Sequence, residues 1–339
     1  MKVSVPAAIL PPTQSRARRF TGAFLLLSLL FSLSIFVWKR SDIFPWIGSC
    51  NPGGYEEGSF MAYCHSSRFG DFEHRAYWNE LEPVMGHVRE ADVLFLGNSR
   101  TQYAFSTDPV LDWFEQSPLT HYVFGFGMGS QNLVPERLAQ KYKLRPRTLI
   151  INADPFFTDY ESVTNKNAFE ESAVRSWEYT AKMWLQARQE SICTNDDGGL
   201  LSGLFCDGDM ETLFRDRANG HWDVRYFREN QRIPVKIDNN QNTGVSVEKA
   251  ADIAERFFNS FGVDKDCVIL TVTPRAQTAL AFGESLAERL GVAGIFPLPE
   301  NLITVDASHL DPPSADRWSS RLMQEAAPII EACGEKPGP

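Results

Sequence analysis

A short apolar run that ends in a glycine and a serine constrains this chain most. Residues 93 to 96 read Val-Leu-Phe-Leu without a polar break, as expected of a strand that is covered on both faces. Gly97 permits a tight turn after that strand, and Ser99 follows. Ligands and catalytic groups collect at the carboxyl ends of strands in open α/β sheets. The sequence therefore predicts an α/β sheet with Ser99 at its carboxyl edge.

A catalytic serine needs a base, and one candidate lies near the other end of the chain. Serine is a weak nucleophile unless a histidine, itself oriented by a carboxylate, takes its proton. Asp306 and His309 are three residues apart and follow the apolar run 303–305. That spacing lets the carboxylate contact one imidazole nitrogen while the other faces outward. The sequence predicts a triad, although a serine after a strand also serves as a turn former or helix cap.

Strand and helix patterns alternate along the rest of the chain. Apolar runs predict strands, and apolar residues at helical spacing predict helices between them. This alternation is typical of a doubly wound parallel sheet. The expected strands are 93–96, 121–124, 148–151 and 267–273, and the expected helices are 108–113, 135–142, 246–261, 277–290 and 314–331.

Two motifs of this chain resemble those of a known superfamily. The block Gly97-Asn98-Ser99-Arg100 is similar to the nucleophile block of the SGNH (GDSL-type) hydrolases, and Asp306-x-x-His309 is similar to their last block. The order of the blocks also matches, over roughly residues 92–333. The resemblance is strongest with membrane-tethered envelope relatives, the alginate-acetylation and D-alanyl-transfer proteins. It implies a flavodoxin-like domain with catalytic Ser99, Asp306 and His309.

The resemblance also implies an oxyanion hole. The backbone N–H of Ser99 would contribute, with a glycine N–H from the loop 125–132, where Gly127 is the first choice and Gly129 the second. The side-chain amide of Asn152 would be the third donor. The chain departs from the family pattern in two blocks, because residue 98 is Asn rather than Asp and the usual Gly-x-Asn-Asp is altered around Asn152.

No cofactor or metal is expected. The Gly-x-Gly-x-Gly pattern of the loop 125–132 lacks the full spacing and the acidic ribose partner of a dinucleotide site.

Arg100 is expected to form an ion pair or to bind an anionic substrate rather than to perform chemistry.

The N-terminal part of the chain predicts a membrane anchor. Residues 1–19 form a basic tail, and Phe20 to Trp38 carry no charge. At about 1.5 Å per residue, such a helix nearly spans the ~30 Å hydrocarbon core of a bilayer. More basic residues precede the run than follow it, which predicts a cytoplasmic N-terminus and an extracytoplasmic domain on the inner membrane. A cleaved signal peptide, or a lipoprotein site at Cys50, is the alternative.

Composition and cysteines agree with such a location. The formal net charge of −10 argues against a nucleic-acid surface. All six cysteines follow the apolar run, which fits an oxidising compartment. Sequence alone cannot choose among the possible pairings, but Cys50 with Cys64 and Cys193 with Cys206 are natural local pairs, which leaves Cys267 with Cys333.

The expected organisation has four parts. A tail (1–19) and an anchor (20–38) precede a linker and irregular lead-in (39–90), and a hydrolase-like domain follows (91–335). An insertion over about 156–245 interrupts this domain, with a long amphipathic helix around 168–190. It is expected to form a helical and irregular cap over the serine edge, or else a connection without substrate contact.

Two functional classes follow. The first is a serine esterase or O-acyltransferase that acts on O-acyl groups, with acetyl expected, of an envelope polysaccharide or peptidoglycan sugar. For this class the resemblance implies a multi-pass membrane acyltransferase as a partner. The second is a non-catalytic scaffold or polysaccharide-binding subunit that keeps the same fold.

Overall fold

The structure of the chain is a computed structural model. It describes residues 14–40, 58–64, 73–80, 82–127, 131–162, 212–224, 231–239 and 244–336, with single positions between 169 and 184.

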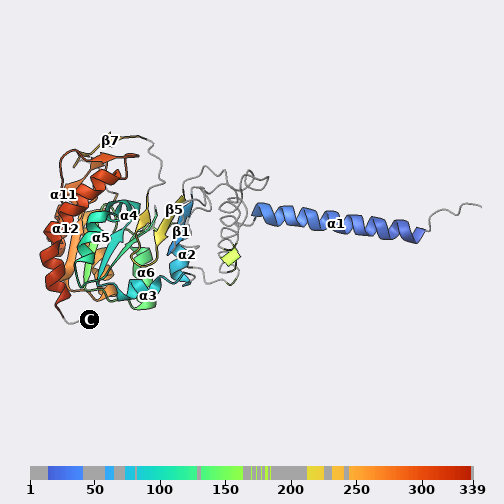
Figure 1. Cartoon of the computed structure of the whole chain (residues 1–339), viewed down its shortest axis with the longest axis horizontal. Coiled ribbons are helices and arrows are strands. Elements are labelled where there is room, and N and C mark those ends of the chain that lie inside the picture. The colour runs from blue at the N-terminus through green and yellow to red at the C-terminus, as the bar shows by residue number, and fades with distance from the viewer. Residues whose placement is uncertain are drawn as a thin grey trace, which may run out of the picture.

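A five-stranded parallel sheet forms the centre of the domain (Figure 1). Its spatial order is β11-β9-β4-β2-β3, and every neighbouring pair is parallel. Numbered along the chain, this is the 2-1-3-4-5 order of flavodoxin-like sheets. The predicted parallel α/β sheet is confirmed, and its strands are β2 (Val93–Gly97), β3 (His121–Gly125), β4 (Thr148–Asn152), β9 (Val268–Thr271) and β11 (Ala293–Gly294).

The fifth strand of the sheet is not among the four that the sequence predicts. The apolar run at 303–305 forms β12 (Ile303–Thr304), which pairs antiparallel with β7 (Ile233–Pro234) outside the main sheet. The fifth position in the sheet belongs to β11, which is only two residues long. A strand this short has no periodicity for the sequence to display.

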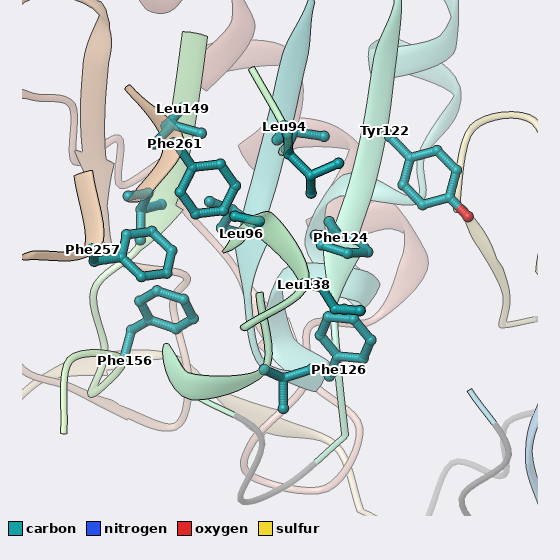
Figure 2. Close-up of a cluster of buried hydrophobic side chains, with 14 of the residues drawn as sticks. Leu94, Leu96, Tyr122, Phe124, Phe126, Leu138, Leu149, Phe156, Phe257 and Phe261 are labelled. Atoms are coloured by element: carbon teal, nitrogen blue, oxygen red, sulfur yellow. The ribbon is translucent and has the colours of Figure 1, made fainter. Parts of the chain in front are cut away.

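Helices cover both faces of the sheet. On one face, α3 (Met85–Glu90), α6 (Leu133–Tyr142), α10 (Val247–Phe261) and α11 (Leu280–Leu290) pack against alternate residues of the strands. Figure 2 shows this cluster, in which Leu94, Leu96 and Phe124 of the strands face side chains of α6 and α10. The apolar stripe of α10 is as predicted: Ser246 caps it by accepting the Lys249 N–H, and Gly262 ends it in the left-handed conformation.

The opposite face carries α4 (Ser99–Phe105), α5 (Asp108–Glu115) and α12 (Pro312–Gly334). Their side chains pack on the other set of strand residues, among them Val93 and Phe95. Trp318 of α12 is fully buried there. The strands therefore read as continuous apolar runs because both of their faces are covered.

One of the possible disulfides is present in the described residues. Cys267 bonds to Cys333 and ties the start of β9 to the end of α12. The expected local pairs, Cys50 with Cys64 and Cys193 with Cys206, lie outside the residues whose side chains are described.

The lead-in and the insertion form a second, smaller sheet. The lead-in was expected to be irregular, but β1 (Ser59–Cys64) pairs antiparallel with β5 (Thr212–Asp216) of the insertion, and β5 pairs with β6 (Trp222–Asp223). The helix α2 (Glu73–Trp78) follows β1. The lead-in is therefore part of the fold, because segments far apart in sequence complete each other's hydrogen bonds. Most of the predicted helix 168–190 lies outside the described residues.

The N-terminal apolar run forms the helix α1 (Gln14–Arg40). Phe20, Phe24 and Phe31 are among its exposed side chains. Among the described helices, none is long and apolar enough to cross a membrane.

Candidate active site

Ser99 lies where β2 turns into α4, at the carboxyl edge of the sheet. Asn98 caps α4, and its side chain accepts the Arg100 N–H. Gly97 is required because a Cβ there would overlap the Thr101 hydroxyl and approach Asn152 Cβ at 3.1 Å. The chain thus turns sharply and places Ser99 at the first position of the helix.

His309 and Asp306 meet Ser99 from a loop between β12 and α12, here termed the 306–309 loop. His309 Nε2 lies 2.8 Å from Ser99 Oγ, and His309 Nδ1 lies 2.7 Å from Asp306 Oδ2. The other Asp306 oxygen accepts the backbone N–H groups of Ser308 and His309 at 2.9 and 2.8 Å. Ala307 between them has a φ of 68°, an uncommon conformation for a residue with a side chain. The structure therefore brings together the three residues that the sequence singled out.

The carboxylate of this group is held in its charged form. Burial raises the pKa of Asp306, but the hydrogen bonds and charge of His309, with the N–H of Ser308, lower it to about 2. Asp306 is therefore ionised at neutral pH. An ionised acceptor fixes the proton of His309 on Nδ1 and leaves Nε2 free to accept the Ser99 proton.

Tyr103 packs against the histidine and was not expected from the sequence. The centroid of its ring lies 4.3 Å from that of His309 and 5.9 Å from that of Trp222 of the insertion. Tyr103 is four residues after Ser99 on α4. Since residues four apart share a helix face, this spacing is the signal that could have identified it.

Arg100 forms the predicted ion pair. Its guanidinium donates to the Asp154 carbonyl at 2.8 Å and to Ser308 Oγ at 3.3 Å, and it lies 3.6 Å from the Asp154 carboxylate. Arg275 approaches the same carboxylate at 3.1 Å. Burial lowers the pKa of Arg100, and Asp154 opposes that effect. This arginine therefore connects the turn after β4 to the 306–309 loop.

No family model, curated protein or solved structure matches this chain.

The predicted oxyanion donors differ in the hydrogen bonds that they make. The Ser99 N–H lies in the first turn of α4, where backbone N–H groups lack intrahelical acceptors. The Gly127 N–H donates to Glu73 Oε1 at 3.2 Å, so in this conformation it is already paired. Asn152 accepts the Asp154 and Thr273 N–H groups, and its Nδ2 is buried without an acceptor. Gly129 lies outside the described residues.

Glu73 is a buried carboxylate that sequence reasoning did not single out. Its carboxylate accepts hydrogen bonds from Arg215 Nη1 at 2.7 Å, from Trp222 Nε1 at 3.3 Å and from the Gly127 N–H. Arg215 is fully buried and also donates to the Val123 and Gly125 carbonyls on the edge strand β3. No local pattern marks these residues, because their partners lie far away in sequence.

The described residues contain no group of three His, Cys, Asp or Glu side chains placed to hold a metal ion. At this edge of the sheet a hydroxyl, an imidazole and a carboxylate lie in one hydrogen-bonded series.

Proposed function

We propose that the chain is an SGNH-type serine esterase or O-acyltransferase that works through an acyl-enzyme. The observation that supports this is the continuous hydrogen-bonded series Ser99–His309–Asp306, at 2.8 and 2.7 Å. A nucleophile, a base in reach of it and a carboxylate that orients the base are the parts that acyl transfer requires.

In the proposed reaction the same groups act in both half-reactions, the acylation of Ser99 and its deacylation. Ser99 Oγ attacks the ester carbonyl carbon, and His309 Nε2 takes the hydroxyl proton while Asp306 holds Nδ1–H. The tetrahedral intermediate collapses, the bond to the leaving alcohol breaks, and His309 returns the proton to that alcohol. Water or a sugar hydroxyl then attacks the acyl-enzyme by the reverse route. The Ser99 N–H would stabilise the oxyanion, with Asn152 and Gly127 as further donors.

The substrate and the location of the proposed enzyme are inferred from its sequence. The motif resemblance favours O-acyl groups, acetyl above all, on an envelope polysaccharide or peptidoglycan sugar, with a multi-pass acyltransferase as the acyl source. The uncharged run Phe20 to Trp38 favours a single-pass inner-membrane protein with its α/β domain outside the cytoplasm.

A non-catalytic scaffold or polysaccharide-binding subunit is the second candidate. The observation in its favour is that Glu73 already occupies the Gly127 N–H. A fold that had lost its chemistry would have no need to keep that N–H available.

The test is intact-mass analysis of the full-length protein with and without p-nitrophenyl acetate. The enzyme proposal expects a transient gain of one acetyl on the parent and on Ser320→Ala, a matched serine change on α12, and no gain on Ser99→Ala. A folded parent that shows neither adduct nor hydrolysis would reject the enzyme in favour of the scaffold.

A further inference from the structure

A hollow of about 460 Å³ lies beside the 306–309 loop. Ala307 of that loop forms one wall, and Arg275 and Ala276, which follow β9, form another. Gln277 also lines the hollow, and the insertion supplies three residues around β7 and β8 (Lys236–Ile237), namely Ile233, Pro234 and Lys236.

The walls of the hollow are bonded to the loop that holds the histidine. The Ala276 N–H donates to the Ala307 carbonyl at 3.0 Å, and the Lys236 N–H donates to the Ala276 carbonyl at 3.1 Å. Gln231, at the start of the same insertion segment, donates its N–H to the Val305 carbonyl at 2.8 Å. A group bound in the hollow is therefore held against the backbone next to His309.

The charged side chains that line the hollow are both cationic, and Gln277 adds a neutral polar group. Lys236 and Arg275 line it, and no carboxylate does so. Arg275 lies 3.1 Å from the Asp154 carboxylate, which Arg100 approaches at 3.6 Å, and the charge of Asp306 also acts on Arg100. Within the described part of the chain, Lys236 has no ion-pair partner, and it is exposed. The charged side chains that line the hollow are therefore positive, whereas the chain as a whole has a formal net charge of −10.

We propose that the hollow binds an anionic group, a carboxylate or a phosphate, on the sugar that carries the ester, and that Lys236 and Arg275 select substrates with that group. The inference rests on the proposed function, since it assigns the substrate class of the same site. Both cations suit such oxygens, and the guanidinium can bind them with two parallel hydrogen bonds. The apolar walls formed by Ile233, Pro234 and Ala276 would contact the carbon–hydrogen face of the sugar ring.

The experiment compares three acetylated methyl glycosides that differ only at carbon six, the exocyclic carbon on the sugar ring. They are the glucoside, the glucuronoside and the glucoside 6-phosphate, and the readout is kcat/KM for acetate release by the full-length protein. We expect both charged substrates to exceed the neutral one by about tenfold. Lys236→Glu should remove this preference, so that the charged and neutral substrates give similar values of kcat/KM. The matched control Lys336→Glu, after α12 at the opposite edge of the sheet, should keep the preference.

The outcomes separate this inference from the proposed function. Activity without a charge preference, or a preference that Lys236→Glu leaves intact, overturns the inference alone. Ser99→Ala is titrated with the same three compounds in parallel. Tighter binding of the charged pair by Ser99→Ala, with no turnover by the parent, supports the hollow and rejects the enzyme. Equal binding of all three by Ser99→Ala rejects the hollow whatever the activity of the parent. A response to only one of the charged groups identifies which anion it takes.

Discussion

Two histidine systems lie at opposite ends of the same sheet, and their surroundings differ. His309 lies at the carboxyl end of the strands, with Asp306 on one nitrogen and Ser99 on the other. His121 lies at the amino end of β3, where its Nε2 is 2.9 Å from Nε2 of His221. One imidazole is placed between a carboxylate and a hydroxyl, whereas the other two are each other's partners.

The pair formed by His121 and His221 has the properties of a structural contact. His121 stacks on Phe114, with ring centroids 4.1 Å apart. Burial lowers the pKa of His121 to about 4, and burial together with His121 and Arg215 lowers that of His221 well below its ordinary value. Both rings are therefore neutral at physiological pH, with one donating to the other. A histidine in a short hydrogen bond is thus no indication of catalysis until its second nitrogen is accounted for.

The largest effect expected from this comparison is on activity. His309→Ala removes the base and should lower kcat/KM for p-nitrophenyl acetate by about 10³-fold or more. His121→Ala removes a partly buried ring that stacks on Phe114 and should lower the melting temperature, with kcat/KM within about threefold of the parent. Equal losses of activity in the two variants would refute the assignment of His309 as the base.

A smaller loss is expected when the orienting carboxylate is neutralised. Asp306→Asn keeps the shape but no longer fixes the proton on His309 Nδ1, and should lower kcat by about 10²- to 10⁴-fold with little change in KM. Asp311→Asn is the matched control, because Asp311 caps α12 through its side chain and asparagine caps equally well. Should both changes lower kcat alike, the role of Asp306 would be structural.

The sequence predicted those parts of the molecule that depend on local patterns. The run at Val93 marked β2, the Asp306-x-x-His309 spacing placed a carboxylate against its histidine, and Ser246 and Gly262 marked the ends of α10. Each of these signals is contained within a few residues. The contact between Ser99 and His309 was predicted from the need of a serine nucleophile for a base, and not from the sheet, because β12 pairs with β7 outside the main sheet.

The rest depends on contacts between distant segments. Glu73 comes from a lead-in expected to be irregular, and it meets Arg215 of the insertion across 142 positions of sequence. Together they bind the edge strand β3 and the Gly127 N–H. The short strand β11 owes its place to β9 rather than to any pattern of its own. No local spacing encodes such partners, so they were missed or assigned to other roles.

The smallest expected effect is a pH dependence of the free energy of unfolding that arises from the pair His121 and His221. His121 has an unfolded pKa near 6.5 and a folded value of about 4. Between these pH values the unfolded chain binds a proton that the folded protein does not, so the free energy of unfolding should fall as pH drops from about 6.5 towards 4. From His121 we expect a loss of about 1–2 kcal/mol at pH 5 relative to pH 7, measured by urea unfolding, and His221 should change the stability in the same direction.

The variant His121→Gln/His221→Gln cannot take up these protons, and its free energy of unfolding should change less over the same range. NMR titration of the parent gives an independent check, because the ring signals of both residues should stay at their neutral positions from pH 7 down to about pH 5. A ring of this pair that titrates near pH 6.5 in the folded protein would show that burial does not keep it neutral. The contrast with His309 would then rest on the positions of Asp306 and Ser99 alone.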